Sequence, residues 1–189
     1  MTDREHTFVI AIVCQDAVGI VHRVSQAISD LDGDIADLRQ SVLRGYLTMI
    51  LVAAFPSQVD EQDLREHLAA IAFPGLPWAD FVVRPADPDV LAQPDPDLEN
   101  AYVLTARGDD RVGFVATVTS FCARQQINIL DLSTAVDAGQ YTMMLLVDLS
   151  RCPDVGAVRQ ALKQFASEQD LKIVLQHNDI FKVTHEVVM

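Results

Sequence analysis

Two stretches of the chain, QDAVGIVHRVSQAI at residues 15–28 and DDRVGFVATVTSFC at residues 109–122, share one spacing of residues. Each has an acidic residue, then a valine and a glycine, then apolar residues at intervals of three and four. Moving the chain by 94 positions superposes the stretches and extends the match without a gap over residues 8–56 and 102–150, with 14 of the 49 positions identical. This common register predicts a tandem duplication.

Each half has the pattern of a βαββαβ unit. The expected strands are residues 8–14, 34–44, 46–55 and 79–84 in the first half and 101–106, 127–137, 140–149 and 171–176 in the second. Apolar residues at helical spacing follow the first and third strands of each half. We expect Asp60 to cap the second helix of the first half, and Pro153 to open its counterpart. This order predicts an α+β fold of the ferredoxin-like type, with both helices on one face of the sheet.

The stretch between the halves, PADPDVLAQPDPDL at residues 85–98, holds four of the eight prolines. Such a composition is typical of an extended, semi-rigid linker. It predicts a first domain at residues 1–84 and a second at residues 99–189. His177 and His185 are expected in a polar extension at the surface of the second domain.

The third strand of each half is apolar on both sides. In the first half Met49 and Leu51 alternate with Ile50 and Val52. Helices on one face of a sheet leave the other face uncovered, and an uncovered apolar face is a sticky surface. We therefore expect association of this face with the sibling domain or with a second chain.

Composition excludes several kinds of protein. The chain carries 27 acidic and 14 basic residues, a net charge of −13, which argues against direct binding to nucleic acid or to an anionic membrane. Its apolar runs are too short for a membrane span, and its start has no signal-peptide pattern. Three cysteines without CxxC spacing suggest neither a disulfide framework nor a zinc site. We expect a cytoplasmic protein without metal or cofactor.

The turn between the first strand and the first helix of each half is suited to bind a zwitterion. Gly19 and Gly113 let backbone N–H groups approach a ligand, and the helix N-terminus favours a carboxylate. An acidic side chain nearby, or Asp34 or Asn128 from the next strand, accepts hydrogen bonds from an ammonium group. The alternative is structural: the glycines only make the turn, and the acidic residues before them cap the helices.

The two copies resemble the ACT domain, a small regulatory module that binds amino acids. The resemblance rests on an acidic residue and a glycine between the first strand and the first helix, and on Asp-Ile or Asn-Ile at the start of the second strand. It implies these candidate ligand-binding residues: Asp16, Val18, Gly19, Ile20, Asp34 and Ile35 in the first copy, and Asp110, Arg111, Val112, Gly113, Phe114, Asn128 and Ile129 in the second. The first copy departs from the pattern, with Ala17 opposite Arg111 and Asp34 opposite Asn128, so the second copy is the favoured site.

These observations favour a non-catalytic regulatory protein, in particular a homodimer that senses a small amino acid and signals through a protein partner. If it regulates transcription, its charge implies that it acts through a DNA-binding partner. A second hypothesis is a structural interaction module whose ligand sites are vestigial. A third is an enzyme that uses Asp32 and Asp34 as a metal-binding DxD pair.

Overall fold

The computed structural model describes residues 6–71, 73, 77–94, 98 and 100–185 of the chain. The chain divides into two compact units, Met1–Pro94 and Asp95–Met189, so the division falls inside the predicted linker. Each unit has its own four-stranded sheet and its own hydrophobic core.

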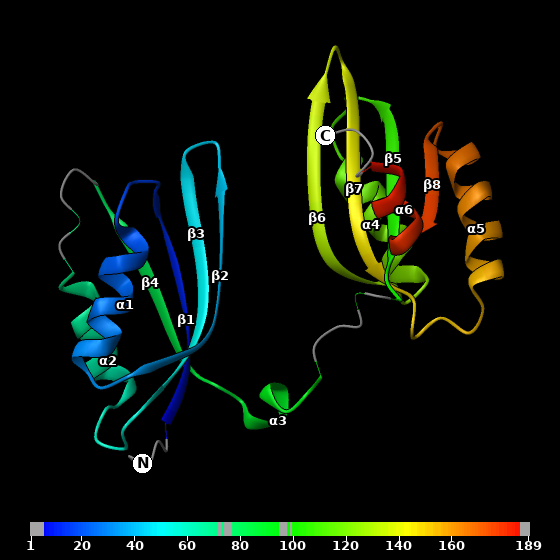
Figure 1. Cartoon of the computed structure of the whole chain (residues 1–189). Coiled ribbons are helices and arrows are strands. Elements are labelled where there is room, and N and C mark those ends of the chain that lie inside the picture. Colours follow the sequence, from blue (N-terminus) through cyan, green and yellow to red (C-terminus); the bar gives the residue numbers. More distant parts are fainter. Residues whose placement is uncertain (1–5, 72, 74–76, 95–97, 99, 186–189) are drawn as a thin grey trace. The chain divides into compact units, whose positions relative to one another are not determined.

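The first unit folds in the order βαββαβ. Its elements are β1 (His6–Gln15), α1 (Ile20–Asp30), β2 (Asp34–Leu43), β3 (Tyr46–Phe55), α2 (Glu61–Ala69) and β4 (Ala79–Pro85). The sheet is antiparallel in the order β2-β3-β1-β4. Figure 1 shows α1 and α2 on the same side of this sheet. The first and third strands are therefore central, and β2 and β4 are the edges.

The second unit repeats this order. Its elements are β5 (Tyr102–Asp109), α4 (Phe114–Arg124), β6 (Asn128–Asp137), β7 (Gln140–Asp148), α5 (Val155–Glu168), β8 (Lys172–His177) and α6 (Asn178–His185). The strand order β6-β7-β5-β8 is the same as in the first unit. The predicted pair of ferredoxin-like units is confirmed, and every predicted strand lies within three residues of an observed one.

The second helix of each unit begins at an aspartate. Asp60 accepts a 2.8 Å hydrogen bond from the N–H of Asp63, as predicted for an N-cap. In the second unit the prediction that Pro153 opens the helix is wrong. Asp154 accepts from the N–H groups of Gly156 and Ala157, both at 2.9 Å, and α5 starts one residue later at Val155. A carboxylate that satisfies two free N–H groups sets the start of this helix more strongly than proline's fixed φ.

Each hydrophobic core lies between the sheet and its two main helices. Along β3 the residues alternate, with Leu47, Met49 and Leu51 buried and Tyr46 and Ile50 exposed. This alternation is the pattern of a strand with one face toward a core. The buried residues of β1, α1 and α2 complete the first core, and the equivalent residues of β5, α4, β7 and α5 complete the second.

The other face of the first sheet is open within its unit. Val13, Ile50 and Val82 are 41%, 52% and 51% exposed there. Ile50 and Val82 pair with Ala11 from opposite sides, so these residues form one apolar patch. A patch of this kind supports the expectation that the face associates with another surface.

The second sheet differs because its own C-terminal helix packs against it. Helix α6 contacts β5 and β8, and Figure 1 shows it on the side of the sheet away from α4. Val103, which faces away from the main core, is only 7% exposed. The side-chain amide of the buried Asn178 donates to the carbonyl oxygen of Leu98 at 2.8 Å. The prediction of a polar extension at the surface is thus wrong in part, because α6 partly covers the face of the second sheet that lies away from α4.

The predicted linker contains a short helix, α3 (Pro88–Leu91). Asp87 caps it by accepting from the N–H of Asp89 at 2.9 Å, and Pro88 occupies the first helical position. Aspartate followed by proline is a helix-start signal, and it overrides the expectation of an extended segment in this part of the linker.

All three cysteines are free, and Cys14 and Cys122 are both buried. Cys122 lies on α4 in the second core. Burial raises the pKa of its thiol from 9.0 to about 11. Since the folded state holds this proton more tightly than the unfolded state, the thiol's contribution to stability is complete below pH 9 and is lost as the pH rises through 11. We expect that contribution to be about 2–3 kcal/mol.

The prediction is tested by denaturant unfolding between pH 8 and pH 11. The wild-type chain should lose about 2–3 kcal/mol more than a Cys122→Val variant over this range. Valine suits the site because Ile28, the counterpart in the first unit, is also apolar and buried. Identical pH dependence in both proteins would contradict the raised pKa.

Candidate ligand-binding site

Each unit has a tight turn between its first strand and its first helix, at residues 16–19 and 110–113, which we call the elbow. The φ angles of Gly19 and Gly113 are +93° and +85°, in the left-handed region that side chains with a Cβ disfavour. A Cβ built on either glycine meets no atom within 4 Å. Conformation, rather than crowding, therefore requires glycine at the elbow, and the space above it is open.

The two helices that follow the elbows start without a side-chain cap. Gly19 and Gly113 are the N-cap residues of α1 and α4, and among the described residues no side chain accepts a hydrogen bond there. The alternative in which Asp16 and Asp110 cap these helices is therefore wrong. The first turns contain no acidic residue. In the second unit the N–H of Phe114 donates to the carbonyl oxygen of Arg111 at 3.3 Å, and the other N–H groups of the first turn have no acceptor within the helix and carry partial positive charge. That arrangement suits a carboxylate.

Each elbow is joined to the hairpin between the second and third strands. The N–H of Asp16 donates to the carbonyl oxygen of Gly45 at 2.8 Å, and the N–H of Asp110 donates to that of Gly139 at 2.9 Å. The carboxylates of both aspartates remain exposed. In each unit this bond joins the glycine turn of the elbow to the glycine turn of the hairpin. It gives a physical reason why the spacing between the two turns is the same in both copies.

The other predicted elbow residues differ in exposure. Val18 and Val112 are fully exposed, at 105% and 106%, so each projects an apolar side chain into solvent. Ile20 and Phe114 are both 2% exposed and belong to the two cores. A ligand at the elbow can meet the backbone of Ile20 or Phe114 but not the side chain, which corrects the expectation for these two residues.

Arg111 has a partner within its own unit. Its guanidinium donates to the carbonyl oxygen of Gln169, at the C-terminal end of α5, at 3.0 Å. The first unit has Ala17 at this position. The arginine therefore ties the second elbow to α5, and a ligand carboxylate would have to share or replace this contact.

Asp34, Ile35, Asn128 and Ile129 lie at the opposite end of their sheets from the elbows. Gln15, just before the first elbow, pairs with Tyr46, whereas Asp34 pairs with Ala54, eight residues further along β3. Eight residues of extended strand span about 26 Å. The expectation that the second strand places an acceptor beside the elbow of its own unit is therefore wrong, and the second sheet repeats the separation.

The enzyme hypothesis requires Asp32 and Asp34 to bind a metal ion as a DxD pair. Asp32 has φ +55° and follows the last turn of α1, where its N–H bonds to the carbonyl oxygen of Ser29. Within the described part of the chain, no three histidine, cysteine or acidic side chains gather as a metal site. None of the described helices is long and apolar enough to cross a membrane.

Comparison with known families identifies the two units. The sequence profile of the ACT domain matches residues 6–72 and 100–176, which is one match in each unit. The chain belongs to the ACT domain family. It is a tandem ACT-domain protein, as the duplicated elbow motifs predicted.

Curated relatives of this ACT-domain protein have a single copy. The UPF0237 protein of Methanococcus maripaludis is 37% identical over 91 residues, which are 100% of that protein and 48% of this chain. The UPF0237 protein of Neisseria meningitidis is also 37% identical over 91 residues, covering 99% and 47%. Each relative therefore corresponds to about one unit.

Two solved structures resemble this fold along most of the chain. A protein of unknown function from Galdieria sulphuraria is 27% identical, with a TM-score of 0.68, and the match covers 90% of this chain and 97% of that one. A protein proposed to be a glycine cleavage system transcriptional repressor matches with a TM-score of 0.66 over 90% and 96%, at 16% identity. The second likeness concerns the fold alone.

One polar feature of the first ACT unit lies outside the site residues that the sequence predicted. His22, Arg23, Asp30 and His67 line a groove between α1 and α2. The sequence does contain a signal for this groove, because charged and imidazole side chains lie on two successive helices. The comparison of the two copies does not reveal it, because the second copy has none of these residues at the matching positions.

Proposed function

We propose that this tandem ACT-domain protein is a non-catalytic amino-acid sensor with its ligand at the elbow, chiefly at the second elbow. The ACT domain is a regulatory module that binds small molecules, and this chain has two of them. The proposed ligand is a small α-amino acid, and the proposed setting is the cytoplasm.

One observation carries the proposal: both elbows combine a left-handed glycine, an uncapped helix N-terminus and open space. A carboxylate can accept from the free N–H groups of the first turn, where the helix dipole favours negative charge. The exposed carboxylate of Asp110 lies in the same turn and is suited to accept from an ammonium group. An α-amino acid carries both groups on one carbon atom.

The separation of Asn128 from its own elbow supports a site completed by a second copy. Strands β2 and β6 are edge strands, so one side of each has no neighbouring strand in its own sheet. If an edge strand pairs antiparallel with the same strand of a second chain, the start of one strand lies at the hairpin end of the other, where the elbow is. We therefore propose a homodimer in which Asn128 of one copy serves the elbow of the other copy.

The proposed output is a change in contact with a protein partner. A ligand shifts an equilibrium only through different contacts in the alternative states, and a site shared between copies provides such a difference. The acidic charge of the chain disfavours DNA as the direct partner. We propose that any effect on transcription passes through a separate DNA-binding protein.

The test is a panel of the twenty amino acids, measured by thermal shift and by calorimetry with the full chain. We expect at least one to raise the melting temperature, because a ligand at 100 times its Kd stabilises the folded state by about 2.7 kcal/mol. Sedimentation of the same samples should give a dimer. If none of the twenty binds at millimolar concentration, the sensor proposal fails and the structural interaction module takes its place.

A further inference from the structure

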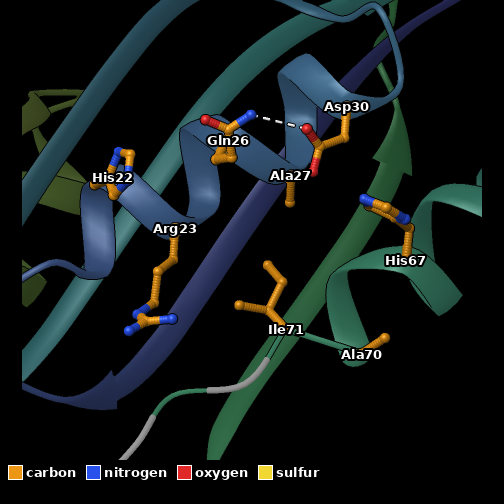
Figure 2. A pocket seen from close by; sticks show the side chains of 8 residues that line it. All are labelled: His22, Arg23, Gln26, Ala27, Asp30, His67, Ala70 and Ile71. Carbon is orange, nitrogen blue, oxygen red and sulfur yellow. Dashed lines mark hydrogen bonds between the residues drawn. The ribbon is translucent and has the colours of Figure 1, made fainter.

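A groove lies on the outer side of the helices of the first unit, between α1 and α2 (Figure 2). Its volume is about 410 Å³, and Ala27 and Ile71 contribute apolar surface to it. The charged groups along it are Arg23 and Asp30 of α1, and His67 of α2 adds an imidazole. The groove therefore combines an apolar middle with polar ends.

The two charges lie apart on the same helix. Arg23 and Asp30 are seven residues apart on α1, which corresponds to about 10 Å along the axis. Figure 2 shows the guanidinium of Arg23 on the Ile71 side of the groove, and Asp30 at the other end with His67 across from it. The side-chain amide of Gln26 donates to Asp30 at 2.8 Å and so fixes the carboxylate. The result is a cation at one end and an acceptor group at the other.

The fold itself does not require this groove, because aromatic side chains fill the equivalent space between the helices of the second unit. The 94-residue shift places Phe121 at the position of Ala27 and Phe165 at that of Ile71. These two rings pack with their centroids 5.0 Å apart, and the guanidinium of Arg124 lies 5.8 Å from the centre of the Phe165 ring. The first unit thus has small or aliphatic residues where its sibling has packed aromatic ones.

We propose that the groove binds an elongated dipolar molecule, a basic amino acid, with its carboxylate at Arg23 and its side-chain cation at Asp30 and His67. A guanidinium pairs well with a carboxylate, and the ligand would share Arg23 with the contact that this residue already makes. The Asp30 carboxylate and a neutral imidazole both accept hydrogen bonds from an ammonium or guanidinium group. The aliphatic stem of such a ligand matches the apolar surface of Ala27 and Ile71. This site lies between the helices and is separate from the second elbow.

The probes are L-lysine and L-norleucine, titrated into the full chain and followed by calorimetry and by amide chemical shifts. Norleucine keeps the carboxylate and the aliphatic stem but lacks the terminal cation. We expect lysine to bind at least tenfold more tightly than norleucine, with shifts on α1 and α2. Equal affinity of the two probes, or lysine-induced shifts confined to the elbows, would overturn the proposal.

Two kinds of variant locate the site. Asp30→Asn, at an exposed position, should weaken lysine binding at least tenfold, whereas Arg124→Gln at the matching position of the second unit should leave it unchanged. The double variant Ala27→Phe, Ile71→Phe should abolish binding by filling the groove as the second unit does. Lysine binding that survives both Asp30→Asn and the double variant would refute the site. If lysine does not bind in the groove, the proposal of a ligand at the second elbow is unaffected, because the Gly113→Val variant tests it separately.

Discussion

The Leu51→Ala variant is expected to lose about 3–5 kcal/mol of unfolding free energy in the first unit. Leu51 lies in the central strand β3, is 1% exposed and belongs to the first core. Truncation removes buried methyl groups and leaves a cavity that the neighbouring side chains refill only in part. Because the two cores share no residue, the loss should be confined to one unit.

Hydrogen exchange read by mass spectrometry separates the two units in one experiment. A loss of about 3 kcal/mol should accelerate exchange in the core strands of the first unit about a hundredfold, with peptides of β5 and β7 unchanged. The control Leu43→Ala, at a position 72% exposed, should change stability by less than about 0.5 kcal/mol. Equal acceleration in both units would show that they unfold together.

The sequence predicted the strands well because their signals are local. Period-two burial along β3 and the glycine turns at Gly45 and Gly139 leave little freedom in where the strands begin and end. Two signals from neighbouring residues were misread. Asp154 starts α5 although Pro153 precedes it, and Asp87 with Pro88 forms a helical turn inside a stretch that composition alone marks as extended.

The candidate site was harder to predict because its parts come from both ends of the sheet. Motif spacing places Asp34 fifteen residues after Gly19, but α1 carries the chain back along the whole sheet between them. Only strand register shows that the two are far apart. Burial of the Ile20 and Phe114 side chains is likewise a property of packing, which an alignment of the two copies does not reveal.

The Gly113→Val variant is expected to abolish amino-acid binding at the second elbow. The glycine has φ +85°, and a β-branched residue resists this conformation at a cost of about 1–2 kcal/mol. A Cβ at this position meets no atom within 4 Å, so the effect does not come from crowding at the Cβ. The added side chain would instead occupy the open space in which the ligand lies, or straighten the turn that presents the free N–H groups.

Calorimetry with the amino acid identified by the panel measures this effect, and Gln126→Val provides the control for strain. Gln126 has φ +57° and lies at the other end of α4, so valine there adds backbone strain without reaching the elbow. We expect Gln126→Val to bind as the wild type does, and Gly113→Val to bind at least a hundredfold more weakly. The matching Gly19→Val variant reports on the first elbow. Undiminished binding in Gly113→Val and Gly19→Val alike would place the ligand elsewhere, because both glycine elbows would then be closed.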